Sequence, residues 1–415
     1  MGGHHKGHSG NNNQSSYVYN DTYQRPKKTL HLCSPHLVLS RFETEGSYSY
    51  VTLLVYHISR YIGVRFIVPL TPILERQVLL NMAELVWKGK KSYAAIAAET
   101  ALATQQLYIK EDHPCKQEHS ASDSQMWHNR LLHGDKSSVL AALLNEFATS
   151  VDLVYIDPPF MTGRTFSKDA QVAYSDTWGN DLDGYLQWLY HTFVLLHLLL
   201  ASNGSLYVHL DWRAAHYARI LLDEIFSTHS AGAGFRNEII WQYQSGGRAQ
   251  KSYARKHDTI LLYTKSPQYC FHPERIAERR GTQRRNHMRK TVKGDGHVCW
   301  TIRSAGRLYT YDEDSLITPT DVWSDIHHLH QKDPERNGYA TQKPEALLER
   351  IILASSEEGN LVLDCFCGSG VTPAVAERLR RRWIACDQSE LAIEVTRQRL
   401  LAQQQAPFVL QHVVR

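Results

Sequence analysis

Short apolar runs alternate with longer amphipathic stretches from about residue 129 onward, and this alternation is typical of an α/β fold. The stretches 181–204 and 212–226 are apolar at helical spacing, and the first is expected to end at Asn203-Gly204. The runs predicted to be strands are NRLLH, VDLVYI, SLYVHLD, NEIIWQY, HDTILLYTK, LVLD and RWIAC. The predicted fold class is therefore α/β, with a doubly wound, mainly parallel sheet.

Other parts of the chain follow different patterns. Residues 1–30 are rich in Gly, His, Asn and Ser and are predicted to be a disordered lead. Within 31–120 the stretch 75–111 has helical spacing, which predicts a partly helical accessory region. Residues 266–320 interrupt the α/β pattern, and 273–296 is rich in Arg and Lys, so a loop-rich basic insertion is expected there.

Composition narrows the function classes only slightly. The 415 residues are 42% hydrophobic, enough for a large core and about two domains. The net charge is +4, so bulk charge does not identify a nucleic-acid binder. Seven cysteines without regular spacing do not match a disulfide framework, so a reducing, cytoplasmic location is expected, near the nucleoid in a bacterium. The apolar stretch 51–70 contains His57, Arg60 and Arg65, so no membrane span is predicted.

A glycine-rich turn follows one predicted strand, in LVLDCFCGSG (361–370). Glycines at a strand end let a ligand approach the backbone, and the next helix offers free N–H groups. Asp387 ends the following strand, near the spacing at which an acid meets ribose hydroxyls. The unit suits an adenosine-containing cofactor. An ordinary strand-to-helix turn and the cofactor site of a nicotinamide enzyme are the alternative interpretations. Asp364 before the turn also fits a methyl-donor site, where an acid faces an ammonium group.

The stretch VDLVYIDPPFMTG (151–163) ends an apolar run on an acid, two prolines and an aromatic ring. Asp157 and the Pro158 carbonyl could accept both N–H bonds of an exocyclic amino group, and the prolines would hold that carbonyl still. Phe160 offers a face on which a base can stack. The alternative is a rigid turn with a solvated acid, because Asp-Pro is a common turn opener.

DPPF together with DCFCGSG resembles the DNA amino-methyltransferases, which methylate adenine N6 or cytosine N4 from S-adenosylmethionine. DPPF precedes the glycine turn, as in the circularly permuted β class of that family. Further matches in family order cover roughly 129–405, the expected methyltransferase domain: NRLLHGD, GSLYVHLDWR, NEIIWQY, KHDTILLYTK, DVWSDI and TQKPEALLERII. Val371 and Cys365 depart from the family's usual threonine and proline but leave the glycines intact.

The resemblance implies a role for each matching residue. The residues that would bind and activate the target base are Asp157, Pro158, Pro159 and Phe160. Those that would contact the cofactor are Asp135, Lys343, Asp364, Phe366, Gly368, Ser369, Gly370, Thr372 and Asp387. The basic insertion 266–320 falls where the family keeps its target-recognition region, and the candidates for contact with double-stranded DNA are Arg279, Arg280, Arg284, Arg285, Arg289 and Lys290. A solvated loop is the alternative for these.

Several alternatives stay open at this point. Adenine is favoured over cytosine because the cytosine enzymes more often carry Ser where this chain has Asp157. An RNA or protein-glutamine methyltransferase and a catalytically inactive DNA-binding module are the other candidates. A homodimer and a partner restriction nuclease are further associations that the resemblance allows.

Other polar clusters are read as structural. Cys270, His272 and Cys299 lack the usual zinc-ligand spacing, so no metal site is predicted. His327, His328 and His330 are expected to be loop residues. The pairs His257-Asp258 and Trp212-Arg213 are interpreted as scaffold or DNA-side residues.

Overall fold

The computed structural model describes residues 36–44, 47–56, 66–69, 83–102, 106–113, 127–168, 171–178, 181–227, 232–244, 249–281, 287–403 and 406–414. The chain divides into two compact units, Met1–Gln77 and Val78–Arg415. In the first unit β1 (His36–Thr44), β2 (Ser47–Tyr56) and β3 (Phe66–Pro69) form an antiparallel sheet. The predicted disordered lead 1–30 lies outside the described residues.

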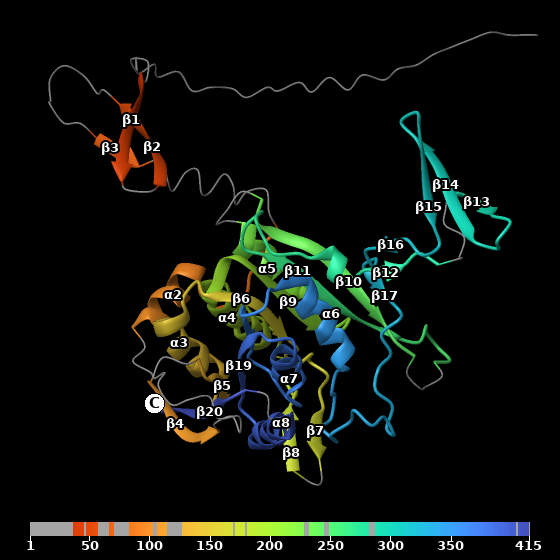
Figure 1. Ribbon diagram of the computed structural model, residues 1–415. Coiled ribbons are helices and arrows are strands. Elements are labelled where there is room, and N and C mark those ends of the chain that lie inside the picture. Colours follow the sequence, from red (N-terminus) through yellow and green to blue (C-terminus); the bar gives the residue numbers. More distant parts are fainter. Residues whose placement is uncertain are drawn as a thin grey trace, which may run out of the picture. The chain divides into compact units, whose positions relative to one another are not determined.

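The second unit is built on a ten-stranded sheet of order β17-β10-β11-β9-β6-β18-β19-β5-β20-β4 (Figure 1). Its strands are β4 (Gln106–His113), β5 (Asn129–His133), β6 (Val151–Ile156), β9 (Leu200–Leu210), β10 (Gly234–Gln242), β11 (His257–Thr264), β17 (Val322–Trp323), β18 (Leu361–Asp364), β19 (Arg382–Asp387) and β20 (Phe408–Val414). Of these ten described strands, β4 and β11 run against the others. The predicted mainly parallel α/β sheet is confirmed.

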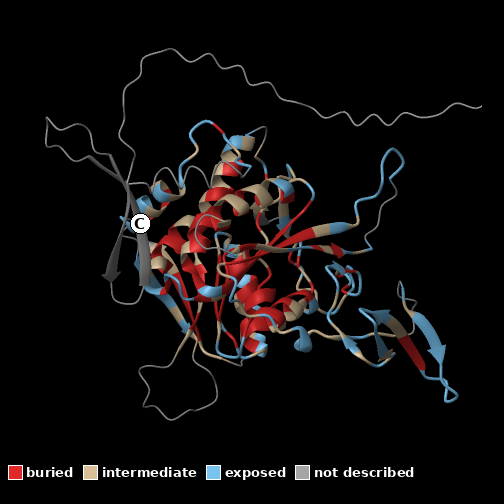
Figure 2. Ribbon diagram, turned by 90° about the horizontal axis from the view of Figure 1, so that it is seen from above, coloured by how far each residue is buried: buried red, intermediate tan, exposed pale blue. Residues whose placement is uncertain are grey.

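Two helical layers cover the sheet, as expected when a parallel sheet is buried on both faces. The helices are α2 (Tyr93–Ala101), α3 (Lys136–Phe147), α4 (Leu182–Leu199), α5 (Ala215–Ser227), α6 (Glu345–Ser355), α7 (Val371–Arg378) and α8 (Glu390–Gln403). Side chains of β6 alternate between the layers: Val154 and Ile156 pack with α3, α4 and α5, whereas Leu153 and Tyr155 pack with α6, α7 and α8. Figure 2 shows this buried sheet and its helices in red.

The N-terminal border of the sheet unit differs from the prediction. Residues 106–113, whose first part was expected to be helical, form β4, and α2 is confined to Tyr93–Ala101. Antiparallel pairing of β4 with β20 outweighs the helical spacing, because backbone hydrogen bonds along a strand depend on a partner that local sequence does not reveal. The unit therefore begins well before residue 129.

The long helix α4 also ends earlier than expected, at Leu199 rather than Asn203. Leu200 already pairs with Val151 of β6, so residues 200–204 continue the sheet as the first half of β9. Lys265 Nζ donates to the carbonyls of His197 (2.7 Å) and Leu200 (2.6 Å). This partly buried ammonium satisfies carbonyls at the helix end, where the sequence predicted that Asn-Gly ends the helix.

The basic insertion is more ordered than a loop. Strands β13 (Arg289–Val292), β14 (Val298–Ser304) and β15 (Arg307–Asp312) form an antiparallel sheet, and β12 (Glu278–Arg279) pairs with β16 (Leu316–Ile317). Trp300 of β14 is fully buried. A short helical turn, η1 (Pro273–Arg275), precedes these strands.

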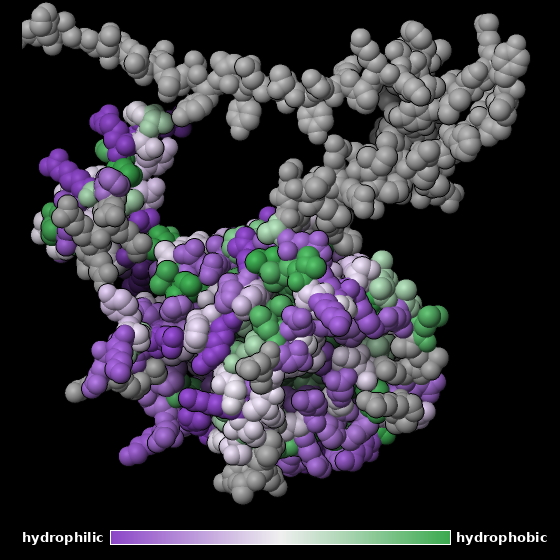
Figure 3. Space-filling model, turned by 180° about the vertical axis from the view of Figure 1, so that it is seen from behind, coloured by the Kyte–Doolittle hydropathy of each residue, from purple (hydrophilic) through white to green (hydrophobic). Residues whose placement is uncertain are grey.

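The surface drawn in Figure 3 is mostly hydrophilic with small apolar groups. None of the helices in the described part of the chain has both the length and the apolar character of a membrane span. Within the same residues the cysteines with free thiols are Cys270, Cys299, Cys365, Cys367 and Cys386.

Candidate active site

Four acids stand at the carboxyl ends of neighbouring parallel strands. Asp157 follows β6, Asp211 follows β9, and Asp364 and Asp387 end β18 and β19. Parallel strands collect these ends at one edge of the sheet, where ligands bind in open α/β folds. All four acids line one cavity of about 390 Å³.

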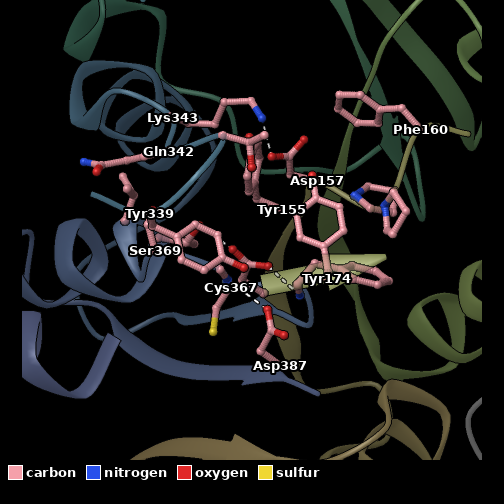
Figure 4. A pocket seen from close by; sticks show the side chains of 18 of the residues that line it. Tyr155, Asp157, Phe160, Tyr174, Tyr339, Gln342, Lys343, Cys367, Ser369 and Asp387 are labelled. Atoms are coloured by element: carbon pink, nitrogen blue, oxygen red, sulfur yellow. Dashed lines mark hydrogen bonds and ion pairs between the residues drawn. The ribbon is translucent and has the colours of Figure 1, made fainter. Parts of the chain in front are cut away.

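The two carboxylate oxygens of Asp157 differ in their hydrogen bonding. Its Oδ2 accepts a hydrogen bond from Lys343 Nζ, in an ion pair whose side chains are mostly buried (Figure 4). Its Oδ1 is buried and has no hydrogen-bond partner among the described residues. A buried carboxylate oxygen without a donor is costly, so this atom is suited to accept an N–H group from a ligand.

The loop after Asp157 is fixed by Asp176, which is 1% exposed. The carboxylate of Asp176 accepts from the backbone N–H groups of Phe160 (3.1 Å), Met161 (2.9 Å) and Thr162 (2.7 Å) and from the Thr162 hydroxyl (2.7 Å). Met161 has a positive φ of 61°, a conformation that needs support from its surroundings. Asp176 therefore determines where the Phe160 ring lies.

A buried polar network lies behind Phe160. The ring stacks on His209, with centroids 6.2 Å apart, and Lys343 Nζ lies 5.5 Å from its centroid. His209 Nδ1 shares a hydrogen bond with the Tyr155 hydroxyl (2.9 Å), and its Nε2 faces Asp258 Oδ2 (3.2 Å). The network holds the aromatic face at the cavity wall.

The glycine-rich turn bends sharply between β18 and α7. Gly368 and Gly370 have φ of 48° and 73°, and Gly370 is the N-cap of α7. A Cβ on Gly370 would lie 2.7 Å from Thr396 Oγ1 of α8. Glycine is required there by both backbone conformation and space, so the turn passes close to α8 and opens toward the cavity.

The acids beside this turn have perturbed pKa values. Asp364 accepts from Thr372 Oγ1 (2.5 Å) and Phe366 N (2.9 Å), and burial raises the pKa of its carboxyl to about 7. Asp387 accepts from Gly368 N (3.0 Å) and Ser389 N (2.9 Å), and burial raises its pKa to about 6. Neither acid forms an ion pair with a described residue, so both favour a ligand that supplies cations or hydroxyl donors.

The DNA methylase family model matches residues 151–398, more than half of the chain. The chain belongs to this DNA methylase family, whose members act on adenine N6 or cytosine N4. Among its relatives, the type II methyltransferase M.HpaI of Haemophilus parainfluenzae is 30% identical over 266 residues, covering 64% of this chain and 72% of that one.

One further relative and one solved structure are also similar to this chain. The DNA adenine methyltransferase YhdJ of Escherichia coli K12 is 30% identical over 274 residues, covering 65% of this chain and 82% of its own. The solved structure of a DNA modification methylase from Thermus thermophilus, in complex with S-adenosylmethionine, aligns with a TM-score of 0.43 at 18% identity, covering 68% of this chain and 97% of that one.

Most predicted site residues of this methylase line the one cavity. They are Asp157, Pro158, Pro159, Phe160, Lys343, Asp364, Phe366, Gly368, Ser369, Thr372 and Asp387. Gly370 lies behind the lining, against α8, and Asp135 caps α3 by accepting from the N–H groups of Ser137 and Ser138. Lys343, predicted to contact the cofactor, lines the cavity and donates a hydrogen bond to Asp157.

Four of the basic residues predicted for DNA contact lie on or beside the small sheets of the insertion. Arg279 pairs with Asp314 at 3.1 Å, and Arg280 stacks on Tyr311 at 4.2 Å. Arg289 and Lys290 are exposed on β13. Arg284 and Arg285 lie outside the described residues.

The cysteine and histidine clusters separate in the structure. Cys299 Sγ donates to Asp312 (2.9 Å), away from Cys270 and His272, which instead approach Glu357. His272 faces Glu274 and Glu357 at 3.2 and 2.6 Å. His328 lines the cavity, and Asp258 does so as part of the His209 network.

The sequence did not identify Asp176 or Lys136 as site residues. Asp176 fixes the loop that contains Phe160, and Lys136 lines the cavity. Asp176 stands in a polar stretch after a short hairpin, β7 (Thr165–Lys168) and β8 (Gln171–Ser175), where an acid is common. Lys136 follows the Gly-Asp motif and reads as an exposed first-turn lysine. No local signal distinguishes either residue, because each acquires its role through burial.

Proposed function

We propose that this methylase transfers a methyl group from S-adenosylmethionine to the exocyclic amino group of a flipped DNA base, with adenine N6 as the target. One observation carries the proposal: the partnerless Oδ1 of Asp157 shares a cavity with Phe160 and with the glycine-rich turn. An acceptor, a stacking face and a cofactor turn in one cavity match an amino-methyl transfer.

The lining residues fit S-adenosylmethionine. Asp364, with its raised pKa, gains most from a nearby cation such as the ammonium of the methionine moiety. Asp387 lies at the end of β19, where its carboxylate suits ribose hydroxyls. When bound, the cofactor supplies an electrophilic methyl group on its sulfonium sulfur.

The chain's own residues prepare the base amino group. Its lone pair is delocalised into the ring, so the nitrogen is a poor nucleophile. Asp157 Oδ1 accepts one N–H, and the Pro158 carbonyl, held by the ring of its own residue and by Pro159, accepts the other. These contacts favour a pyramidal nitrogen, and the carboxylate stabilises the positive charge that develops on it.

Phe160 and Lys343 complete the arrangement. Phe160 stacks the flipped base, and its position follows from the Asp176 hydrogen bonds. Lys343 orients Asp157, because its ammonium donates to Oδ2 and leaves Oδ1 directed to the ligand.

Adenine is favoured over cytosine on two grounds. The acid Asp157 stands where cytosine enzymes more often carry serine, and the relative YhdJ is named a DNA adenine methyltransferase. The name of M.HpaI as a type II methyltransferase further supports a restriction–modification role, with a separate nuclease as partner.

The test identifies the product base. Purified protein is incubated with methyl-labelled S-adenosylmethionine and plasmid DNA, and the DNA is digested to nucleosides. Label in N6-methyladenine is expected, and Asp157→Ala should remove it. Label in N4-methylcytosine alone would correct the substrate, and equal DNA labelling by wild type and Asp157→Ala would refute the catalytic assignment. An inactive DNA-binding module would give no label with either protein.

A further inference from the structure

A buried lysine that none of the proposed steps uses lies in the cavity wall. Lys136, the first residue of α3, is only 4% exposed and lines the cavity. Its Nζ donates to Ser137 Oγ (2.9 Å) and lies 4.7 Å from the centre of the Trp188 ring. A lysine so deeply buried normally has an anionic partner.

The described residues provide no such partner. No carboxylate among them lies within ion-pair distance of Lys136 Nζ. The neighbouring Asp135 is exposed, and its carboxylate accepts from the backbone of Ser137 and Ser138. Cys365 and Cys386 are also near, but burial raises the pKa of each thiol, so neither supplies a negative charge.

The pKa of Lys136 agrees with a buried cation that has no counter-ion among the described residues. Burial lowers the pKa of Lys136 to about 8, and the negative charge of Asp135 only partly opposes this effect. At neutral pH the side chain is still mainly charged, so a ligand anion that reaches it would gain a charge-assisted hydrogen bond.

The charges of the cavity limit which anion this is. Among the described residues, Lys136 and Lys343 are the only Lys or Arg side chains in the lining, and Asp157 already occupies Lys343. S-adenosylmethionine carries two cationic groups and a single anion, its carboxylate. Asp364 and Asp387 suit the ammonium and the ribose, which leaves Lys136 for the carboxylate.

We propose that Lys136 binds the carboxylate of the cofactor's methionine moiety and thereby selects an intact amino-acid end on the cofactor. This assignment rests on the proposed use of S-adenosylmethionine. It names a binding residue that the motif comparison does not provide, because Lys136 lies outside the glycine turn and outside DPPF.

The test compares two ligands that differ only in that group. S-adenosylhomocysteine and its decarboxylated analogue are titrated calorimetrically into wild type, Lys136→Met and Lys136→Gln. Wild type should bind S-adenosylhomocysteine about 10- to 100-fold more tightly than the analogue, the range of a buried charge-assisted bond. Both variants should lose this preference while binding the analogue within about twofold of wild type.

Controls separate binding from folding. Lys91→Met removes an exposed lysine paired with Glu99 and should leave both affinities unchanged. The ligand-free melting temperature of Lys136→Met should equal or exceed that of wild type, because a buried unpaired cation is removed. Equal weakening of both ligands by both Lys136 variants would overturn the assignment. Failure of wild type to bind either ligand would instead overturn the proposed cofactor, and this assignment with it.

Discussion

At the scale of single residues, the site depends on how Asp157 is held. One carboxylate oxygen is occupied by Lys343 and the other is buried without a donor among the described residues, so the acid presents a single acceptor to the ligand. Asp176 fixes the following backbone through three N–H groups. The chemistry at Asp157 is therefore prepared by two side chains distant from it in sequence.

Lys343→Met tests this interpretation against the cofactor role suggested by its motif. Without the ammonium, Oδ2 of Asp157 loses its hydrogen-bond donor, and the carboxylate is no longer held with Oδ1 toward the ligand. We expect kcat at pH 7 to fall about 100-fold, the loss that a misplaced reacting group can cause. Steady-state methylation assays measure kcat and KM for both proteins. A raised KM for S-adenosylmethionine with unchanged kcat would contradict it and support the cofactor role.

At the scale of elements, the edge of the parallel sheet brings several acidic side chains together. β6, β18 and β19 end side by side, so their terminal acids share one cavity. The glycine turn between β18 and α7 lets α7 and α8 pack closely. Substitution of its glycines should therefore destabilise the fold.

Gly370→Ala should destabilise the fold in two ways. A positive φ costs a non-glycine residue about 1 kcal/mol, and the new Cβ would crowd Thr396, adding about 1–3 kcal/mol. Gly359→Ala is the matched control, because Gly359 has φ +80° with open space around it and should show the strain alone. Denaturant unfolding of both variants measures the difference, and equal losses would show that the contact with α8 is unimportant.

The strand-end acids should make cofactor binding pH-dependent. Ligand-free Asp364 and Asp387 have pKa values raised to about 7 and about 6, so at pH 5 both are mainly protonated. An ammonium group binds the ionised carboxylate, so binding at low pH must release protons and is weaker. We expect the Kd for S-adenosylhomocysteine to fall as pH rises from about 5 to about 7 and then to level off.

Calorimetry in buffers of different ionisation enthalpy would measure the proton release directly. Asp364→Asn should flatten most of this pH dependence, because it removes the carboxyl with the larger shift. A constant Kd and no proton release between about pH 5 and about pH 7 would contradict the assignment of these acids to the cofactor.

At the scale of the whole molecule, the division at residues 77 and 78 separates two compact units. The described residues that line the cavity all belong to the second unit. Within that unit α2 and β4 precede the motif-bearing region, and Ile96 of α2 and the nearby Trp87 belong to the main core.

Truncation should distinguish these parts. Deletion of Met1–Gln77 should leave both the melting temperature and DNA methylation close to those of the full chain. Deletion through His113 also removes β4 from the edge of β20 and uncovers apolar core, so the melting temperature should fall by several degrees. Thermal unfolding and the methylation assay measure both, and loss of activity in the shorter deletion would assign a catalytic role to the first unit.

From about residue 129 onward, and outside the basic insertion, the sequence by itself determined the order of the main strands and helices and the acids at strand ends. Parallel strands place their carboxyl ends at one edge, so Asp157, Asp364 and Asp387 could be brought together from alternation and motif order alone. The glycine turn was equally predictable, because its conformation is a local property of glycine.

Only the tertiary structure decided which partners these residues have. Four features depend on segments far apart in the chain. They are the ion pair of Lys343 with Asp157, the hydrogen bonds to Asp176, the burial of Lys136 and the early end of α4. Their physical reason is desolvation: a polar side chain buried by packing must find a partner wherever the fold supplies one, and no local pattern specifies that partner.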